Sequence, residues 1–127
     1  MPHHSRLSTL VLDCHVDDLQ PALEFWSAAL GKPVATPDED GDGRYGVLAT
    51  DEDEPIILLQ KVEHESRVHL DIESDDIDAE ADRLERLGAR KVAFVKRWWV
   101  MEAPTGHRFC VVRPQRERFG SHLNRWD

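Results

Sequence analysis

Cysteine is scarce in this sequence. Only Cys14 and Cys110 occur among the 127 residues, and they stand far apart, without a CxxC pattern or the Cys/His spacing of a zinc site. A disulfide framework and a structural zinc site are therefore not indicated, and we expect both residues to be reduced thiols.

Long apolar runs are also missing. No stretch approaches the roughly eighteen residues that a membrane-spanning helix needs. The start, MPHHSRLSTL, lacks the long apolar core of a signal peptide. We therefore expect a cytoplasmic protein.

Positive charge is in short supply as well. Sixteen basic against 25 acidic side chains leave a formal charge of -9, which repels nucleic-acid phosphates and anionic membrane surfaces. Nucleic acid and membranes are thus disfavoured as partners. The basic residues near the C-terminus alternate with acidic and polar ones, which predicts a solvated tail rather than a binding patch; they are Arg113, Arg116, Arg118 and Arg125.

Several common catalytic motifs are absent. The sequence has no GxSxG, no Gly-rich phosphate loop and no HExxH. All histidines except His69 fall in tails, strand ends and turns, and we predict them to be surface residues: His3, His4, His15, His64, His107 and His122.

An internal repeat is the most informative feature that is present. The segments VLDCHVDDLQPALEFWSAALGKPV and HLDIESDDIDAEADRLERLGARKV share one plan: a short apolar strand, a double aspartate, a helix of about three turns, a Leu-Gly stop and a β-branched restart. The length fits a single domain, 1–127. We divide it into module one at about 7–62, module two at about 67–113, and a polar C-terminal tail at 114–127.

Each copy of the repeat carries the signals of one amphipathic helix. The predicted caps and stops are Asp17 or Asp18, Pro21 and Gly31 in the first copy, and Asp75 or Asp76 and Gly88 in the second. The predicted buried stripes are Leu19, Ala22, Leu23, Trp26 and Leu30, and then Ile77, Ala81, Leu84 and Leu87.

Strand signals follow each helix. After the first helix they lie near 33–35, at 44–50 and in PIILLQKV; after the second they lie at 91–95, at 98–101 and in HRFCVV. The predicted order is βαβββ, twice. The acidic loop 37–43 resembles part of a calcium loop, but Thr50 falls near the place where a glutamate is required, which favours a solvated loop.

Three segments carry a resemblance to a known family. They are LQPALEFWSAALG after the first strand, RVHLDI at the start of the second copy and APTGHRFCVV at its end. In this order and spacing they resemble the vicinal oxygen chelate superfamily (glyoxalase, bleomycin-resistance and dioxygenase-like proteins), and within it the glyoxalase-like proteins, over about residues 7–113. The resemblance implies an α+β fold in which two βαβββ modules form a curved mixed sheet, with a concave ligand cleft and the helices on the convex side. It also implies a homodimer.

Strand alternation indicates which side chains face the expected cleft. In the fifth strand Val68, Leu70 and Ile72 suit the helix side, so that His69 and Asp71 face the cleft. Other strands contribute further cleft residues: Val11, Asp13, Gln60, Trp98 and Cys110.

Metal-dependent relatives usually hold a His, Gln or Glu ligand at four such places. The resemblance carries these places over to Val11, Gln60, His69 and Cys110. Only His69 is a strong ligand type, because Val11 cannot bind a metal, Gln60 is a weak oxygen donor and Cys110 replaces a carboxylate. An open catalytic site normally needs about three protein ligands, so Asp71 would have to join. We therefore expect no cofactor, with a divalent metal as the alternative.

Three functions stay open, because one fold hosts isomerases, dioxygenases, thiol transferases and drug-sequestering binders. The first is a glyoxalase-like protein that binds a small organic molecule in the cleft, lined by Gln60, His69, Trp98 and Cys110. The second is a lyase, isomerase or dioxygenase with a reduced metal site centred on His69, or a metal-free acid–base catalyst using His69 and Asp71. The third is a vestigial cleft in a chain that only dimerises. A cavity histidine bonded to a neighbour such as Asp71, a small buried Cys110 and a Trp98 at the dimer interface are the purely structural alternatives.

Overall fold

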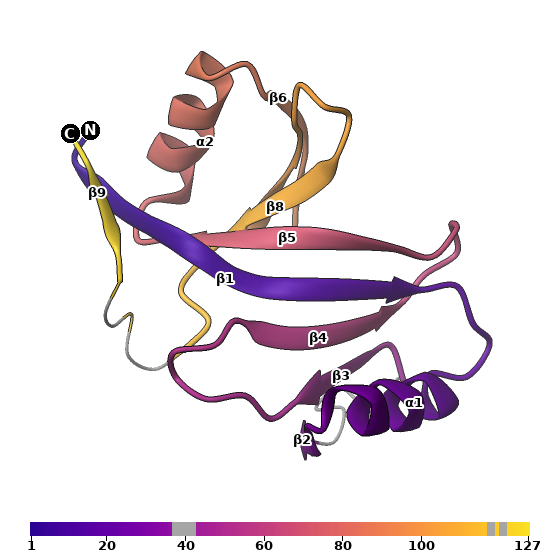
Figure 1. Ribbon diagram of the computed structural model, residues 1–127. Helices are drawn as coiled ribbons and strands as arrows, with labels where there is room; N and C mark the ends of the chain where they lie inside the picture. Colours follow the sequence, from indigo (N-terminus) through magenta and orange to yellow (C-terminus); the bar gives the residue numbers. More distant parts are fainter. Residues whose placement is uncertain (37–42, 117–118, 120–121) are drawn as a thin grey trace. The chain divides into compact units, whose positions relative to one another are not determined.

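The computed structural model in Figure 1 describes residues 1–36, 43–116, 119 and 122–127. The elements are β1 (His3–Cys14), α1 (Gln20–Leu30), β2 (Val34–Thr36), β3 (Tyr45–Leu48), β4 (Ile56–Lys61), β5 (Arg67–Ser74), α2 (Ile77–Arg86), β6 (Arg90–Val95), β7 (Trp98–Glu102), β8 (Arg108–Val112) and β9 (Asn124–Trp126). The predicted order βαβββ, twice, is confirmed, and so is the mixed α+β fold class. Strand β9 was not predicted.

The chain divides into two compact units that do not coincide with the two copies of the repeat. One unit is Thr9–His69, and the other joins Met1–Ser8 to Leu70–Asp127. Strands β1 and β5 each contribute to both units. The start of β1 therefore belongs to the same unit as most of the second copy of the repeat. The order of the two copies along the chain does not predict this grouping.

In the Thr9–His69 unit the strands lie in the order β2-β3-β4-β1. Strands β4 and β1 are parallel, and the other neighbours are antiparallel. Helix α1 packs on one face, and the core there consists of Cys14, Leu19, Leu23, Leu48 and Leu59, with Leu12, Ala22, Trp26 and Ile57 against it. The prediction for Leu30 is wrong, because this residue is 44% exposed. Helical periodicity predicts the direction of a side chain but not whether a neighbour covers it at the last position of the helix.

Gly46 explains how closely α1 approaches this sheet. A Cβ built at Gly46 on β3 would lie 2.4 Å from Cδ2 of Leu23 and 2.7 Å from its Cδ1. Both distances are shorter than a carbon–carbon contact allows. The absence of a side chain at this position therefore lets Leu23 rest directly on the strand.

The helix ends follow the sequence signals with one exception. Pro21 lies in the first turn of α1, and Gly31 ends the helix in the left-handed conformation with φ 68°. Asp76 caps α2 by accepting a hydrogen bond from the backbone N–H of Ala79 at 3.0 Å. The N-cap position of α1 is Leu19, which makes no side-chain bond, but Asp18, one of the two predicted caps, accepts a hydrogen bond from the backbone N–H of Gln20 at 3.0 Å. Leu19 is buried in the core, and this burial fixes where α1 begins.

In the other unit the strands lie in the order β5-β8-β7-β6. Strands β5 and β8 are parallel, whereas β8 with β7 and β7 with β6 are antiparallel. Helix α2 packs on one face over a core of Ile77, Ala81, Met101 and Val111, with Leu84, Ala89, Trp99 and Phe109 against it. Leu87, which was predicted to be buried, is 66% exposed as the C-cap of α2. In β5, Leu70 is exposed rather than packed under a helix, and so is Val68 in the part of β5 that belongs to the Thr9–His69 unit.

Residues near both ends of the chain contact α2. Strand β9 pairs antiparallel with the start of β1, and Figure 1 shows the two termini side by side. His3 is buried and its Nε2 lies 2.8 Å from Oε1 of Glu80, a fully buried carboxylate. Arg83 holds the same carboxylate and also lies over the ring of Trp126, 3.8 Å from its centroid. We call His3, Glu80, Arg83 and Trp126 the terminal clasp. The prediction of His3 as a surface residue is wrong, because the clasp forms between residues that are far apart in the sequence.

The calcium interpretation of the acidic loop 37–43 falls mostly on 37–42, outside the described residues. It stays a prediction that this loop is solvated. Arg118 of the predicted solvated tail lies outside the described residues as well. Neither described helix is long and apolar enough to cross a membrane.

Candidate ligand-binding site

Polar side chains form a row across the face of the Thr9–His69 sheet that turns away from α1. Asp13 on β1 is the register partner of Gln60 on β4, and Gln60 is the partner of Tyr45 on β3. Register partners point to the same face of a sheet. The amide of Gln60 donates to the hydroxyl of Tyr45 at 3.4 Å.

His69 completes this row from β5. Its Nδ1 lies 2.8 Å from Oδ2 of Asp13. Because an ionised carboxylate can only accept, Nδ1 carries the proton that is donated, and Nε2 is the acceptor nitrogen of the neutral ring. The Asp13 side chain is 3% exposed and the His69 side chain 14%. A buried acceptor thus fixes the orientation of a more accessible imidazole. We call Tyr45, Gln60, Asp13 and His69 the polar row.

Asp13 has a second oxygen whose position is unusual. Oδ1 is buried and has no hydrogen-bond partner among the described residues. A buried polar atom without a partner costs roughly 1–3 kcal/mol, so an ordered water or a bound molecule is the expected partner. Strand alternation predicted Asp13 on this face, but the predicted ligand-binding residues did not include it. The available signal was a carboxylate inside the otherwise apolar strand TLVLDC.

A row of apolar side chains, which we call the apolar row, lies two positions from the polar row on each of β1, β4 and β3. Val11 on β1 pairs with Leu58 on β4, and Leu58 pairs with Val47 on β3. Val11 is buried, whereas Leu58 and Val47 are partly exposed. The same face therefore offers apolar contact area beside a set of hydrogen-bonding groups, which is the usual composition of a small-molecule site.

Arg67 brings a positive charge to the end of the polar row. It precedes His69 by two residues on β5, so that both side chains point to the same face. Its Nε lies 3.8 Å from Oδ2 of Asp13, and the Arg67 side chain is half exposed. Its Nη2 reaches Nε2 of His64 at 3.4 Å.

The remaining predicted site residues belong to the other unit. Asp71 on β5 and Cys110 on β8 are register partners. Trp98 alternates with Trp99, whose Nε1 donates to Asp78 near the start of α2 at 2.9 Å. Trp98 therefore points to the opposite face of that sheet from α2.

The residues present do not fit the metal that the superfamily resemblance implies. In the Thr9–His69 unit Val11 offers no donor atom, Gln60 is a neutral amide, and Asp13 keeps only Oδ1 because His69 engages Oδ2. Of the four positions that the resemblance carries over, this unit thus supplies one strong ligand type, His69, whereas an open catalytic metal site needs about three ligands. His69, Asp71 and Cys110 are residue types that can bind a metal, but a metal held by all three would need ligands from both units.

The Cys14 thiol is buried in the core beside α1. Burial raises the pKa of the Cys14 thiol above its ordinary value, and the charge of the neighbouring Asp13 raises it further. Its Sγ lies 3.3 Å from the carbonyl oxygen of Leu12. Cys14 is therefore an inert core residue in its reduced form, as its place in the α1 core also indicates.

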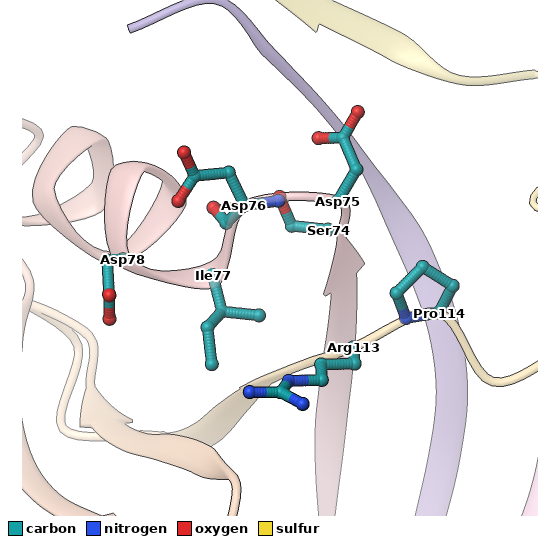
Figure 2. A pocket seen from close by; sticks show the side chains of 7 residues that line it. All are labelled: Ser74, Asp75, Asp76, Ile77, Asp78, Arg113 and Pro114. Carbon is teal, nitrogen blue, oxygen red and sulfur yellow. Dashed lines mark hydrogen bonds between the residues drawn. The ribbon is translucent and has the colours of Figure 1, made fainter.

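A cavity of about 350 Å³ lies elsewhere, at the start of α2. Figure 2 shows Asp75 and Asp76 on the turn that leads into the helix, with Arg113 on the opposite side. Hydrogen bonds from His4 hold the pKa of Asp75 below its ordinary value, although burial alone would raise it. Asp76 caps the helix and Asp78 accepts from Trp99. These carboxylates have structural partners, and none of the predicted site residues lines the cavity.

Comparisons with known proteins agree with this architecture. A family described as glyoxalase-like domain matches residues 9–112. No curated protein matches the chain. Among solved structures, methylmalonyl-CoA epimerase from Mycobacterium tuberculosis is 21% identical with a TM-score of 0.62, covering 87% of this chain and 89% of that one.

Two further structures extend the comparison. Methylmalonyl-CoA epimerase from Streptomyces coelicolor, in complex with 2-nitronate-propionyl-CoA, is 20% identical with a TM-score of 0.64 and covers 87% of this chain and 98% of its own. An extradiol ring-cleaving dioxygenase from B. fuscum is 20% identical with a TM-score of 0.58, covering 85% of this chain and 32% of that one. At these identities the likeness concerns the fold, since the same fold hosts different chemistries.

Proposed function

The chain belongs to the glyoxalase-like domain family, and on that premise we propose that it binds a small organic molecule on the sheet face formed by the polar row and the apolar row. His69 is the central hydrogen-bonding group, and no metal is required for binding. The family and the similar solved structures support a small-molecule protein without identifying its ligand, because those structures include an epimerase and a dioxygenase.

The observation that carries this proposal is the bond between His69 and Asp13. A histidine held at 2.8 Å by a carboxylate that is 3% exposed has a fixed tautomer and a fixed ring plane. Such an arrangement prepares Nε2 to accept one hydrogen bond from a ligand in a defined direction. Preorganisation of this kind reduces the entropy that is lost on binding.

The other members of the site have separate roles. Gln60 and Tyr45 can donate and accept hydrogen bonds at the edge of the ligand. Leu58 and Val47 provide the apolar area on which its hydrocarbon part rests. Trp98 and Cys110 stay predicted ligand-binding residues, and their side chains lie on the face of the other unit's sheet that turns away from α2.

A ligand-observed NMR screen of a small-molecule library tests this function. Compounds that bind should shift the backbone amide signals of Asp13, Gln60 and His69 in the labelled protein. The substitution His69→Ala should reduce their affinity at least about tenfold, as expected for one lost hydrogen bond in a site with a charged partner. His107→Ala is the matched control, because His107 is exposed in a turn. If hits bind equally well to His69→Ala, or if the shifts map elsewhere, the proposal is wrong.

A metal-dependent lyase, isomerase or dioxygenase is the second candidate. One observation favours it: histidines that bind metals commonly donate their other ring nitrogen to a carboxylate, as His69 does to Asp13. Metal content after incubation with iron, nickel, manganese or zinc distinguishes the two candidates. Stoichiometric metal that is lost in both His69→Ala and Cys110→Ser would support the metal-dependent enzyme and overturn the metal-free proposal.

We also propose that the protein is a homodimer, as the superfamily resemblance implies. Sedimentation equilibrium of the full chain gives the assembly mass directly. A monomer mass at concentrations well above those in cells would contradict this part of the proposal.

A further inference from the structure

We infer that the molecule bound at the polar row is a carboxylic acid in its anionic form, and that Arg67 is the residue that selects its charge. This inference rests on the function proposed above. It adds the chemical class of the ligand: a small carboxylate with an apolar part.

The two permanent charges on this face differ strongly in exposure. The Asp13 side chain is 3% exposed, whereas the Arg67 side chain is 50% exposed. They lie 3.8 Å apart, so that the buried negative charge is compensated and the accessible group is the cation. A molecule that arrives at the face therefore meets Arg67 and His69 rather than Asp13.

Two other cations of this unit, Lys61 and Lys32, have partners elsewhere. Lys61 follows Gln60 on β4 and so points to the opposite face. Its Nζ donates to the carbonyl oxygen of Asp17 at 2.7 Å. Lys32 is paired with Glu54 at 2.8 Å. Arg67 is thus a permanent cation that this face presents.

The geometry of Arg67 suits a carboxylate. A guanidinium has five N–H donors in one plane, and two of them can bind both oxygens of a carboxylate. Arg67 contacts Asp13 through Nε and His64 through Nη2. His64 thus holds the guanidinium near the start of β5. His69 lies two residues along the same strand; because its Nδ1 donates to Asp13, its Nε2 is an acceptor, so Arg67 rather than the imidazole would bind the carboxylate.

The rest of the ligand would lie along the sheet. From the polar row the face continues to Leu58 and Val47, which are apolar and partly exposed. A carboxylate at Arg67 therefore places an attached hydrocarbon or aromatic group over apolar side chains. The overall charge of -9 opposes anion binding, but exposed charges act over about 8–10 Å at physiological salt, so the local cation dominates at the site.

Matched acid and amide pairs test the inference with the full chain. The probes are phenylacetate, hexanoate and 1-naphthoate, each compared with its neutral amide by NMR titration at about pH 7.5, where the acids are ionised. We expect at least one acid to bind about tenfold more tightly than its amide, since a hydrogen bond to a charged group contributes more than a neutral one. The shifts should map to Asp13, Gln60 and His69.

Two substitutions with the same change in net charge locate the effect. Arg67→Gln should abolish the preference for the acid, whereas Arg97→Gln, at an exposed turn, should leave it unchanged. Arg67→Lys should retain part of the preference, because it keeps the charge but loses the planar donors. Circular dichroism establishes that each variant is folded, and Arg67 is exposed enough that its replacement should leave the fold intact.

Each outcome has a distinct meaning. If acids and amides bind equally well, or if Arg97→Gln reduces the preference as much as Arg67→Gln, the charge selection is wrong while binding at the polar row stands. If none of the six compounds shifts the polar row and the library screen also gives no hit there, the proposed function fails and this inference fails with it.

Discussion

Replacing Glu80 by Gln should destabilise the protein at neutral pH far more than in acid. In the terminal clasp, Oε1 of Glu80 accepts from Nε of Arg83 at 2.7 Å and Oε2 accepts from its Nη2 at 2.9 Å. His3 reaches Oε1 at 2.8 Å. A Gln side chain has nearly the same shape but carries no charge. Its NH₂ group is a hydrogen-bond donor and would face the donor groups of Arg83 or His3.

The expected loss follows from burial. Glu80 is fully buried and the His3 side chain is 3% exposed, whereas the Arg83 side chain is 19% exposed and keeps some contact with water. Removing one member of a buried charged pair costs about 3–5 kcal/mol. Because Arg83 remains partly solvated, we expect a decrease in the free energy of unfolding of about 2–3 kcal/mol near neutral pH.

The pH dependence has a definite sign. Burial alone would raise the pKa of Glu80, but hydrogen bonds from Arg83, His3 and Ser5 outweigh it and hold the pKa below its ordinary value of 4.5. A carboxyl whose folded-state pKa is lowered contributes stability above its unfolded-state pKa and loses it as the pH falls through the folded-state value. The wild type should therefore lose this contribution below about pH 4.5, and the Gln variant should not.

Urea unfolding between about pH 7 and pH 3 measures both quantities, with linear extrapolation at each pH. The difference between wild type and Glu80→Gln should shrink as the pH falls. Glu85→Gln on the same helix is the matched control: its side chain is 44% exposed and lies 3.4 Å from Lys91, so it should cost less than about 0.5 kcal/mol. A difference that stays constant with pH, or one no larger than that of the control, would refute the clasp as a stabilising network.

Three further predictions concern the cores and the thiols. Gly46→Ala should lower the free energy of unfolding by about 1–2 kcal/mol, because the clash with Leu23 costs about 1–3 kcal/mol and the more restricted unfolded chain offsets part of that cost. Urea unfolding should show that Leu23→Ala lowers the stability less in this variant than in the wild type. Strictly additive effects would contradict the contact. Asp76→Ala should lower the stability by about 1 kcal/mol through loss of the α2 cap, and an unchanged thermal midpoint would argue against the cap. In a Cys110→Ser variant the remaining Cys14 thiol should react with Ellman's reagent more slowly than free cysteine, because its pKa is raised; an equal rate would show that Cys14 is accessible.

Local features of this protein could be predicted from its sequence. The repeat defined two βαβββ copies, Pro21 and Gly31 marked the limits of α1, and Asp76 marked the start of α2. Helical periodicity correctly placed Leu19, Leu23 and Ala81 in the cores. These features follow from backbone preferences and side-chain periodicity within a few residues, which a single segment contains.

The tertiary structure decided which distant residues meet. Asp13 orients His69 across 56 positions of sequence, His3 reaches Glu80 across 77, and Trp126 bonds Ser5 across 121. Periodicity gave the direction of Asp13 and His69 but not their pairing, and it gave no signal for β9 in a polar tail. Such contacts depend on which strands become neighbours, and that choice is set by the packing of the whole chain rather than by any local segment.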